Sequence, residues 1–180
     1  MSELEIDLIL LISPPSKSES KISEEETFSS VFDIGKKIGL RKISLDDFVR
    51  YERAMVAAAT LFMFHGNDLP RINLLETERS SLKLARKQAK EYGLDRILLK
   101  NIPSIGTELG VNDFQDLIRL VLRECIWLSI ESKDRYLHFG YDLYVYFSGK
   151  GAMPKAISEL KNSGMKLTKL KKLPIGHGAH

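Results

Sequence analysis

Residues that could do chemistry gather in one segment, Trp127–Phe147, which reads WLSIESKDRYLHFGYDLYVYF. It contains four of the six tyrosines and the single tryptophan of the chain. A metal-independent ribonuclease needs a general base, a general acid and a cationic group that holds the phosphate. His138, Glu131 and Arg135 could supply these three roles, but their spacing is not specific to such an enzyme. A small nuclease is therefore kept as a second alternative.

A proton relay between His138 and Asp142 is excluded by distance if both lie on one strand. Residues four apart on a strand are separated by roughly 13 Å, far beyond hydrogen-bond reach. His177 and His180 could share a metal only in a helix, which the neighbouring proline and glycines disfavour. The single cysteine, Cys125, excludes an internal disulfide and any zinc site built mainly on thiolates. We therefore predict no catalytic residue, no metal site and no cofactor.

The alternation of apolar residues predicts that this segment is a β-hairpin with two different faces. With Lys133-Asp134 as the turn, Ile130 lies opposite Leu137, and one apolar face continues as far as Phe147. The opposite face carries the polar and aromatic residues, namely Trp127, Ser129, Glu131, Tyr136, His138, Gly140, Asp142, Tyr144 and Tyr146. The apolar face is expected to pack on the helices.

Two interpretations of the polar and aromatic face stay open. Tyrosine and tryptophan offer rigid contact area with a polar group and are enriched at binding hot spots, which indicates a recognition surface. Alternatively, a helix predicted at residues 152–162 folds back over the face and buries it. In this register Trp127 lies opposite Gly140 and covers its backbone. The residues predicted to bind a partner are Trp127, Glu131, Tyr136, His138, Asp142, Tyr144 and Tyr146.

Hydrophobic periodicity and capping residues predict the other elements. Predicted helices cover 28–38, 45–64, 76–92, 113–123 and 152–162, and predicted strands cover 5–12 and 165–173. Ser44 and Asp47 form a variant of the capping box, and Gly93 should end the third helix. Residues 13–26 are predicted to be a flexible loop and 174–180 a loose tail. The sequence thus predicts a single α+β domain, 1–180, in which a helical N-terminal two-thirds packs on an antiparallel sheet with a C-terminal ββαβ unit.

The composition is that of a soluble globular protein, with 43% hydrophobic and 28% charged residues. No apolar run reaches the ~18 residues needed to cross a bilayer, and the residues before Leu8 are acidic where a secretory signal is basic. We therefore expect a cytoplasmic protein without membrane association. Residues 1–30 hold two lysines and seven acidic residues, whereas 149–180 hold seven lysines and one acidic residue. An RNA-binding or regulatory module that uses the lysine-rich C-terminal segment is accordingly the first alternative.

The stretch HFGYDLYVYF, residues 138–147, resembles an aromatic strand of bacterial immunity proteins that neutralise polymorphic toxins, including those of contact-dependent growth inhibition. The pattern F-G-Y-D-x-Y-x-Y is matched by Phe139, Gly140, Tyr141, Asp142, Tyr144 and Tyr146. The resemblance implies a non-catalytic protein that binds and blocks a cognate protein toxin, often a nuclease. The acidic segment Glu19–Glu26 and the face with Glu131 and Asp142 would then occlude the basic cleft of the toxin. Binding of a protein toxin is the leading hypothesis, ahead of nucleic-acid binding.

Overall fold

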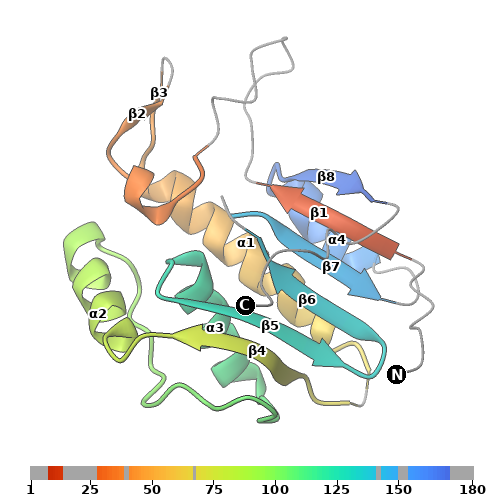
Figure 1. The fold of residues 1–180 in the computed structure, drawn as a ribbon. Coiled ribbons are helices and arrows are strands. Elements are labelled where there is room, and N and C mark those ends of the chain that lie inside the picture. The colour runs from red at the N-terminus through yellow and green to blue at the C-terminus, as the bar shows by residue number, and fades with distance from the viewer. Residues whose placement is uncertain are drawn as a thin grey trace.

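The computed structural model describes residues 8–13, 28–38, 41–66, 68–140, 143–149 and 154–170, with the backbone alone described for 8–13 and Arg41. Six strands form one antiparallel sheet in the order β4-β5-β6-β7-β1-β8 (Figure 1). They are β1 (Leu8–Ser13), β4 (Arg71–Thr77), β5 (Ile126–Ser132), β6 (Arg135–Phe139), β7 (Val145–Gly149) and β8 (Lys166–Lys169). A separate ribbon pairs β2 (Lys37–Ile38) with β3 (Arg41–Lys42). The predicted α+β class is confirmed.

The helices pack mainly on one face of this sheet. They are α1 (Leu45–Met63), α2 (Ser81–Tyr92), α3 (Val111–Leu122) and α4 (Pro154–Asn162). In Figure 1, α1, α3 and α4 lie behind the sheet, and α2 stands to the side, beyond the end of β4. The ring centroid of Phe62 in α1 lies 4.8 Å from that of Phe147 in β7. This contact places the hydrophobic core between α1 and the face of the sheet that carries Phe147.

The helix α1 lies at the centre of the core. Ser44 and Asp47 form the predicted capping box, because the Asp47 N–H donates to Ser44 Oγ over 3.1 Å and the Ser44 N–H to Asp47 Oδ2 over 3.0 Å. The largest buried side chains of α1 are those of Phe48, Tyr51, Met55, Phe62 and Met63. Burial of each such side chain contributes about 1.5–3 kcal/mol. The helix predicted at 45–64 is confirmed.

The first turn of the predicted hairpin is also confirmed. Residues Lys133-Asp134 separate β5 from β6, and Ile130 lies opposite Leu137, as the alternation of apolar residues required. Both of these side chains are fully buried. Because a shift of one residue would have reversed the two faces, the register confirms which side of β5 and β6 packs on the helices.

The prediction of one long second strand was wrong. Between Gly140 and Tyr144 the chain turns, with the Gly140 N–H donating to the Tyr144 carbonyl over 2.7 Å and Leu143 at φ 60°. The segment is therefore a meander of β5, β6 and β7, and the C-terminal unit has one strand more than predicted. Paired residues of β6 and β7, such as His138 and Tyr146, are both even-numbered. The alternation consequently continues through the turn and conceals it.

The helix predicted at 28–38 is reduced to a short 3-10 turn at Val31–Asp33. Ser30 and Asp33 close a capping box around this turn, and Gly35 follows it at φ 87°, a conformation that favours glycine. The chain then enters β2, since the Gly35 N–H donates to the Ile43 carbonyl over 2.8 Å. The apolar spacing at this site reflects packing of Phe28 and Val31 into the core and not a long helix.

The helix predicted to begin at residue 76 begins at Ser81 instead. The residues before it, Arg71–Thr77, form β4, a strand that the sequence analysis missed. Ser81 Oγ accepts the Glu78 N–H over 3.1 Å at the turn between the two elements. Gly93 ends the helix at φ 72°, as predicted.

The helix predicted at 152–162 is present as α4, but it does not cover the polar and aromatic face. α4 packs against α1 and β8, with Ala156 and Leu160 buried. Because α1 lies on the side of Phe147, α4 lies on that side too (Figure 1). The interpretation in which this helix buries the polar and aromatic face is therefore wrong.

Three further predictions are matched within a few residues: the strand at 5–12 by β1, the helix at 113–123 by α3, and the strand at 165–173 by β8. β8 is the last strand of the sheet, so Lys166 and Lys169 lie on an edge, where exposed lysines oppose pairing with other chains. The predicted loop, apart from Ser13, and the predicted tail at 174–180 lie outside the described residues. Among the described helices, none has the length and apolar character to cross a membrane.

Candidate protein-binding face

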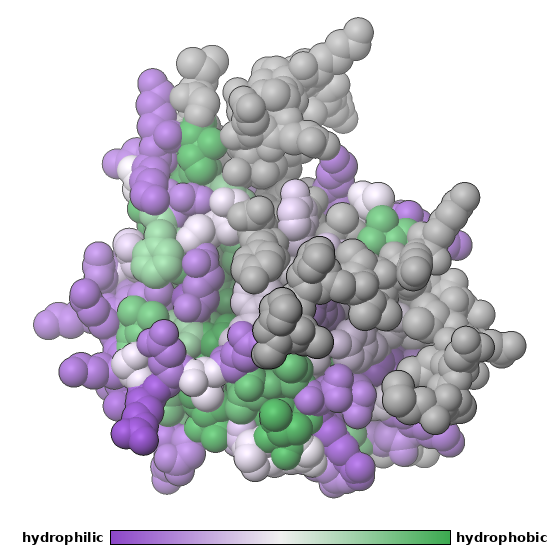
Figure 2. All heavy atoms as spheres, in the orientation of Figure 1, coloured by the Kyte–Doolittle hydropathy of each residue, from purple (hydrophilic) through white to green (hydrophobic). Residues whose placement is uncertain are grey.

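We define the open face as the side of β5, β6 and β7 that points away from α1. It carries Trp127, Ser129, Glu131, Tyr136, His138, Tyr146 and Ser148. Within the described part of the chain, no helix lies in front of it (Figure 1). Figure 2 shows the molecule from the same side, with hydrophobic residues in its lower centre among hydrophilic ones. Because side chains alternate along these strands, one face of the sheet packs on the helices and the other face points away from them.

Three aromatic rings form a row across β6 and β7. The ring centroids of Tyr136 and His138 lie 6.2 Å apart and their planes are inclined by 7°. The centroids of His138 and Tyr146, which are cross-strand partners, lie 5.9 Å apart at 33°. Each ring is half-buried, so one side packs on its neighbours and another side stays accessible. Such a row is stiff and offers much contact area at a low entropic cost.

Polar atoms without partners lie beneath this row. Ser129 Oγ, His138 Nδ1 and Ser148 Oγ are buried and have no hydrogen-bond partner among the described residues. Ser129 lies opposite His138, and Ser148 lies opposite Tyr136, so the three atoms belong to one patch of the open face. A buried polar group without a partner costs about 1–3 kcal/mol. These atoms are closed off from the surface, so a partner would contact the rings of the row and not the atoms beneath them.

Two residues of the row, His138 and Tyr146, have pKa shifts that favour their neutral forms. Burial lowers the pKa of His138 from its ordinary value of 6.5. Burial, with a smaller contribution from Tyr144, raises the pKa of Tyr146 above its ordinary value of 10.0. The centre of the open face therefore carries no charge, which suits a dry contact with another protein.

A small hollow lies at the end of the meander where the turn between β6 and β7 is found. Its volume is about 170 Å³, and Trp127, Gly140 and Tyr144 are among its lining residues. Tyr144 is 38% exposed at its edge. Tyr146 packs closely on Gly140, because a Cβ on Gly140 would lie 2.8 Å from the ring of Tyr146. The hollow could receive one side chain of a partner between two aromatic residues.

The residues of the nuclease hypothesis are not brought together. Arg135 points to the opposite side of the sheet from His138, with its guanidinium carbon 5.8 Å from the ring centroid of Phe62. Glu131 is exposed on the open face, opposite Tyr136, and no hydrogen bond between it and His138 is present among the described residues. Asp142, His177 and His180 lie outside the described residues. No group of three or more His, Cys, Asp or Glu residues in the described chain could hold a metal ion.

Of the seven residues predicted to bind a partner, the structure places five on the open face and a sixth, Tyr144, at its edge. The five are Trp127, Glu131, Tyr136, His138 and Tyr146. The sequence analysis did not single out Ser129 and Ser148 as functional. Both side chains are buried, so they belong to the packing beneath the aromatic rings and offer no contact surface to a partner.

A buried ion pair, also missed from the sequence, joins three parts of the fold. Arg123, which is fully buried, donates from Nε and Nη2 to the two carboxylate oxygens of Glu52 over 2.6 and 2.7 Å. Its Nη1 donates to the Asp95 carbonyl over 2.6 Å, and its own carbonyl accepts from Gln88 Nε2 over 3.1 Å. Each guanidinium nitrogen of Arg123 and each carboxylate oxygen of Glu52 thus takes part in a hydrogen bond, as a buried ion pair requires. The network attaches α2 and the segment after it to α1 and α3.

Comparison with protein-family models, curated proteins and solved structures found no match. The arrangement of the open face is therefore the basis for a functional proposal, together with the resemblance of residues 138–147. In the structure this stretch begins with the last two residues of β6 and ends with the first three of β7, and Phe139 is buried in the core.

Proposed function

We propose that this protein is a binding protein that engages a protein partner through its open face. The observation that carries the proposal is the position of α4, which packs on α1, so that none of the described helices covers the row of Tyr136, His138 and Tyr146. The three rings pack on one another and are half-exposed, and the pKa shifts of His138 and Tyr146 favour their neutral forms. These are properties of the central part of a protein–protein interface.

The chemistry of the face favours a protein over a nucleic acid as the partner. Glu131 is exposed on the open face and Glu76 of β4 lies opposite Trp127 in the register, so carboxylates flank the aromatic residues. Carboxylates repel a phosphate backbone, whereas they can pair with lysine and arginine at the rim of a protein interface. The hollow beside Trp127 and Tyr144 would take one anchoring side chain.

The more specific proposal is that the partner is a toxin and that the protein neutralises it by direct binding, without catalysis, in the cytoplasm. It is supported by the resemblance of residues 138–147 to toxin-immunity proteins and by the placement of Tyr144 and Tyr146 at the open face. A basic toxin surface would be attracted by Glu131 and Glu76, and this attraction would accelerate association.

The first test is genetic and biochemical. We expect an open reading frame for a large secreted toxin next to the gene, and we expect the two proteins to co-purify after co-expression. The double variant Tyr136→Ala/Tyr146→Ala should lose co-purification, while Lys83→Gln/Lys87→Gln, two exposed sites on α2, should retain it. Loss of binding in both variants, or in neither, would contradict an interface at the open face.

A second candidate function, RNA binding, is favoured by the exposed lysines of α4 and β8. Lys155, Lys161, Lys166 and Lys169 are all exposed, as the alternative from the sequence requires. Retention on heparin to about 0.3 M salt or more would reflect many phosphate-like contacts and would support this candidate. Elution at lower salt would exclude it in favour of the protein-binding role.

A further inference from the structure

A pocket on the far side of β4 from the meander has a composition unlike that of the open face. It lies between α2 and the extended segment 94–99, and its volume is about 400 Å³. Its eight lining residues are five aliphatic and three basic ones, namely Leu82, Ala85, Ala89, Ile97, Leu99, Arg86, Lys90 and Arg96. The volume is within the range of ~300–1,000 Å³ that is typical of small-molecule sites.

Both walls of the pocket are fixed to the body of the protein. On one wall, Gln88 of α2 donates to the Arg123 carbonyl over 3.1 Å. On the other, the N–H groups of Leu98 and Leu99 donate to Asp116 Oδ2 over 2.9 and 3.0 Å. The pocket is therefore formed without a ligand, because these hydrogen bonds hold its two walls independently of what lies between them. A ligand would not have to order a loop on binding.

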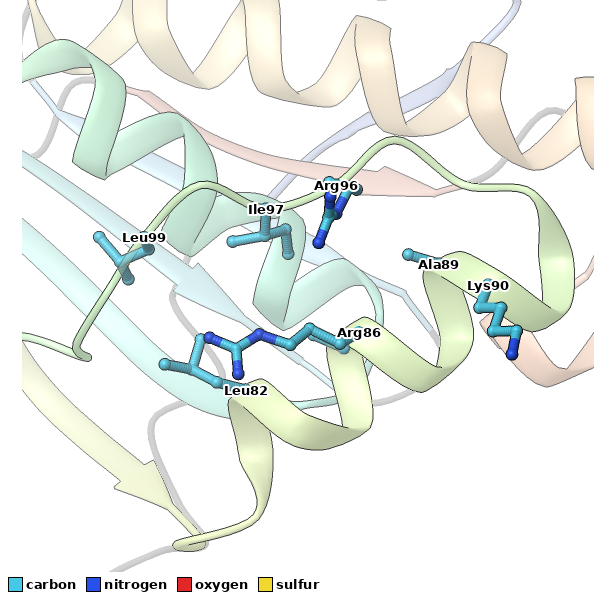
Figure 3. A pocket seen from close by; sticks show the side chains of 8 residues that line it. Leu82, Arg86, Ala89, Lys90, Arg96, Ile97 and Leu99 are labelled. Atoms are coloured by element: carbon cyan, nitrogen blue, oxygen red, sulfur yellow. The ribbon is translucent and has the colours of Figure 1, made fainter.

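The apolar floor comes from small residues on the inner side of α2. Ala85 and Ala89 are nearly buried, yet their short side chains leave the space that larger residues would fill. Leu82 stands at one end of the row, and Ile97 and Leu99 form the facing wall (Figure 3). The floor suits a narrow aliphatic group, since the lining contains no aromatic ring against which a planar ring would stack.

The charges at this pocket all have one sign. Arg96 points from the extended segment toward α2, Arg86 runs along α2 toward Leu82, and Lys90 points away at the end of the row (Figure 3). Among the described residues, none of the three cations has an ion-pair partner. Residues 79–100 as a whole hold seven lysines and arginines against two acidic residues. The two guanidinium groups therefore line the aliphatic pocket from different walls, Arg86 beside Leu82 and Arg96 from the facing segment (Figure 3).

We propose that this pocket binds a small aliphatic carboxylate, with its hydrocarbon chain on the floor of Ala85, Ala89 and Leu99 and its carboxylate on one of the two guanidinium groups, Arg86 or Arg96. The planar guanidinium group matches a carboxylate in geometry and keeps its charge at all physiological pH values. A nucleotide fits less well, because the lining contains no amide, hydroxyl or aromatic side chain to bind a base or a ribose. The proposal is independent of the open face and of its partner.

The test is a calorimetric titration of the full-length protein with decanoate, with decanol and butanoate as comparison ligands. We expect saturable binding of decanoate at one site, and affinity at least about tenfold weaker for decanol, which lacks the charge, and for butanoate, which lacks most of the chain. The double variant Arg86→Gln/Arg96→Gln should weaken decanoate binding at least about tenfold. The control Lys83→Gln/Lys87→Gln removes two charges from the same helix without touching the lining, and it should bind decanoate as the wild type does.

A substitution that fills the pocket tests the contribution of its empty volume separately from the contribution of its charges. Ala89→Leu keeps every cation but occupies the floor, so it should abolish decanoate binding while circular dichroism and the melting temperature show a folded protein. Equal affinity for decanol and decanoate, or equal weakening in both charge variants, would overturn the proposal.

If Ala89→Leu does not fold, an NMR titration of the wild type with decanoate replaces it. We expect chemical-shift changes at Leu82, Ile97 and Leu99, and the absence of such changes would overturn the proposal. Binding of a short single-stranded RNA that decanoate does not displace, with no decanoate signal, would assign the surface to nucleic acid instead.

Discussion

Phe62 of α1 packs on Phe147 of β7, and this contact determines which side of the sheet is open. The two ring centroids are 4.8 Å apart, and both side chains are buried. Because side chains alternate along a strand, the anchoring of Phe147 toward α1 directs its neighbours Tyr146 and Ser148 to the other side. The core and the candidate binding face are therefore two consequences of the same register.

Removal of this aromatic contact should destabilise the whole protein. Phe62→Ala deletes a side chain that is 2% exposed, and we expect the free energy of unfolding to fall by about 3–5 kcal/mol. The adjacent Leu61 is 43% exposed, so Leu61→Ala should change stability by less than about 1 kcal/mol. Urea unfolding of the two variants measures both values. Similar losses in the two would show that α1 does not face β7 through Phe62.

The buried ion pair should be more costly to break than an exposed one. Glu52→Ala leaves the fully buried Arg123 without its carboxylate, and we expect a loss of about 3–5 kcal/mol in unfolding free energy. Arg53 forms an exposed pair with Asp95, and Arg53→Ala should cost no more than about 1 kcal/mol. Urea unfolding again provides the measurement, and a small effect of Glu52→Ala would mean that water reaches Arg123.

The histidine of the open face should make stability dependent on pH. Since burial lowers the pKa of His138 in the folded protein, the unfolded chain binds more protons, and stability falls as the pH decreases through 6.5 toward the folded pKa. The variant His138→Asn removes this titration. Between about pH 7.5 and about pH 5.5, wild type should lose more unfolding free energy than His138→Asn does. Equal losses would indicate that His138 is as hydrated in the folded protein as in the unfolded chain.

The single cysteine should be unreactive in the folded protein. Burial raises the pKa of the Cys125 thiol to about 12, and the thiolate is the reactive form. Alkylation by iodoacetamide near pH 8, followed by mass spectrometry, should be at least about 100-fold slower in native protein than in urea. Comparable rates in the two conditions would contradict the packing of Cys125 against Gln88, whose Oε1 lies 3.3 Å from Sγ.

Local signals in the sequence were enough for several elements. Ser44 and Asp47 correctly predicted the start of α1, Gly93 correctly predicted the end of α2, and the alternation around Lys133-Asp134 gave the register of β5 and β6. These features depend on residues close together in the chain, and their physical causes, a capped helix start and a pleated strand, act over a few residues.

The features that the sequence did not reveal depend on contacts between distant residues, or on a turn that leaves the alternation of apolar residues unchanged. β4 shifts register between Ile72 and Leu74, which breaks its alternation, and its strand character comes from pairing with β5. The turn after Gly140 leaves the parity of the strands unchanged. The position of α4 follows from the strand order, which places β8 at the far edge beyond β1. Arg123 is the last residue of the helix that the sequence predicted at 113–123. Its burial depends on pairing with Glu52, which is distant in the chain, so the sequence alone did not indicate it.

The affinity for the protein partner tests the central claim most directly. For the proposed partner, a toxin that we expect to be encoded beside the gene, Tyr136→Ala/Tyr146→Ala should weaken binding at least about 100-fold, equivalent to about 2.7 kcal/mol, with the folded state confirmed by circular dichroism. The control Lys155→Ala/Lys161→Ala on α4, on the opposite side of the sheet, should leave the affinity within about threefold of the wild type. An unchanged affinity in the tyrosine variant, or a larger loss in the α4 control, would show that the open face is not the binding surface.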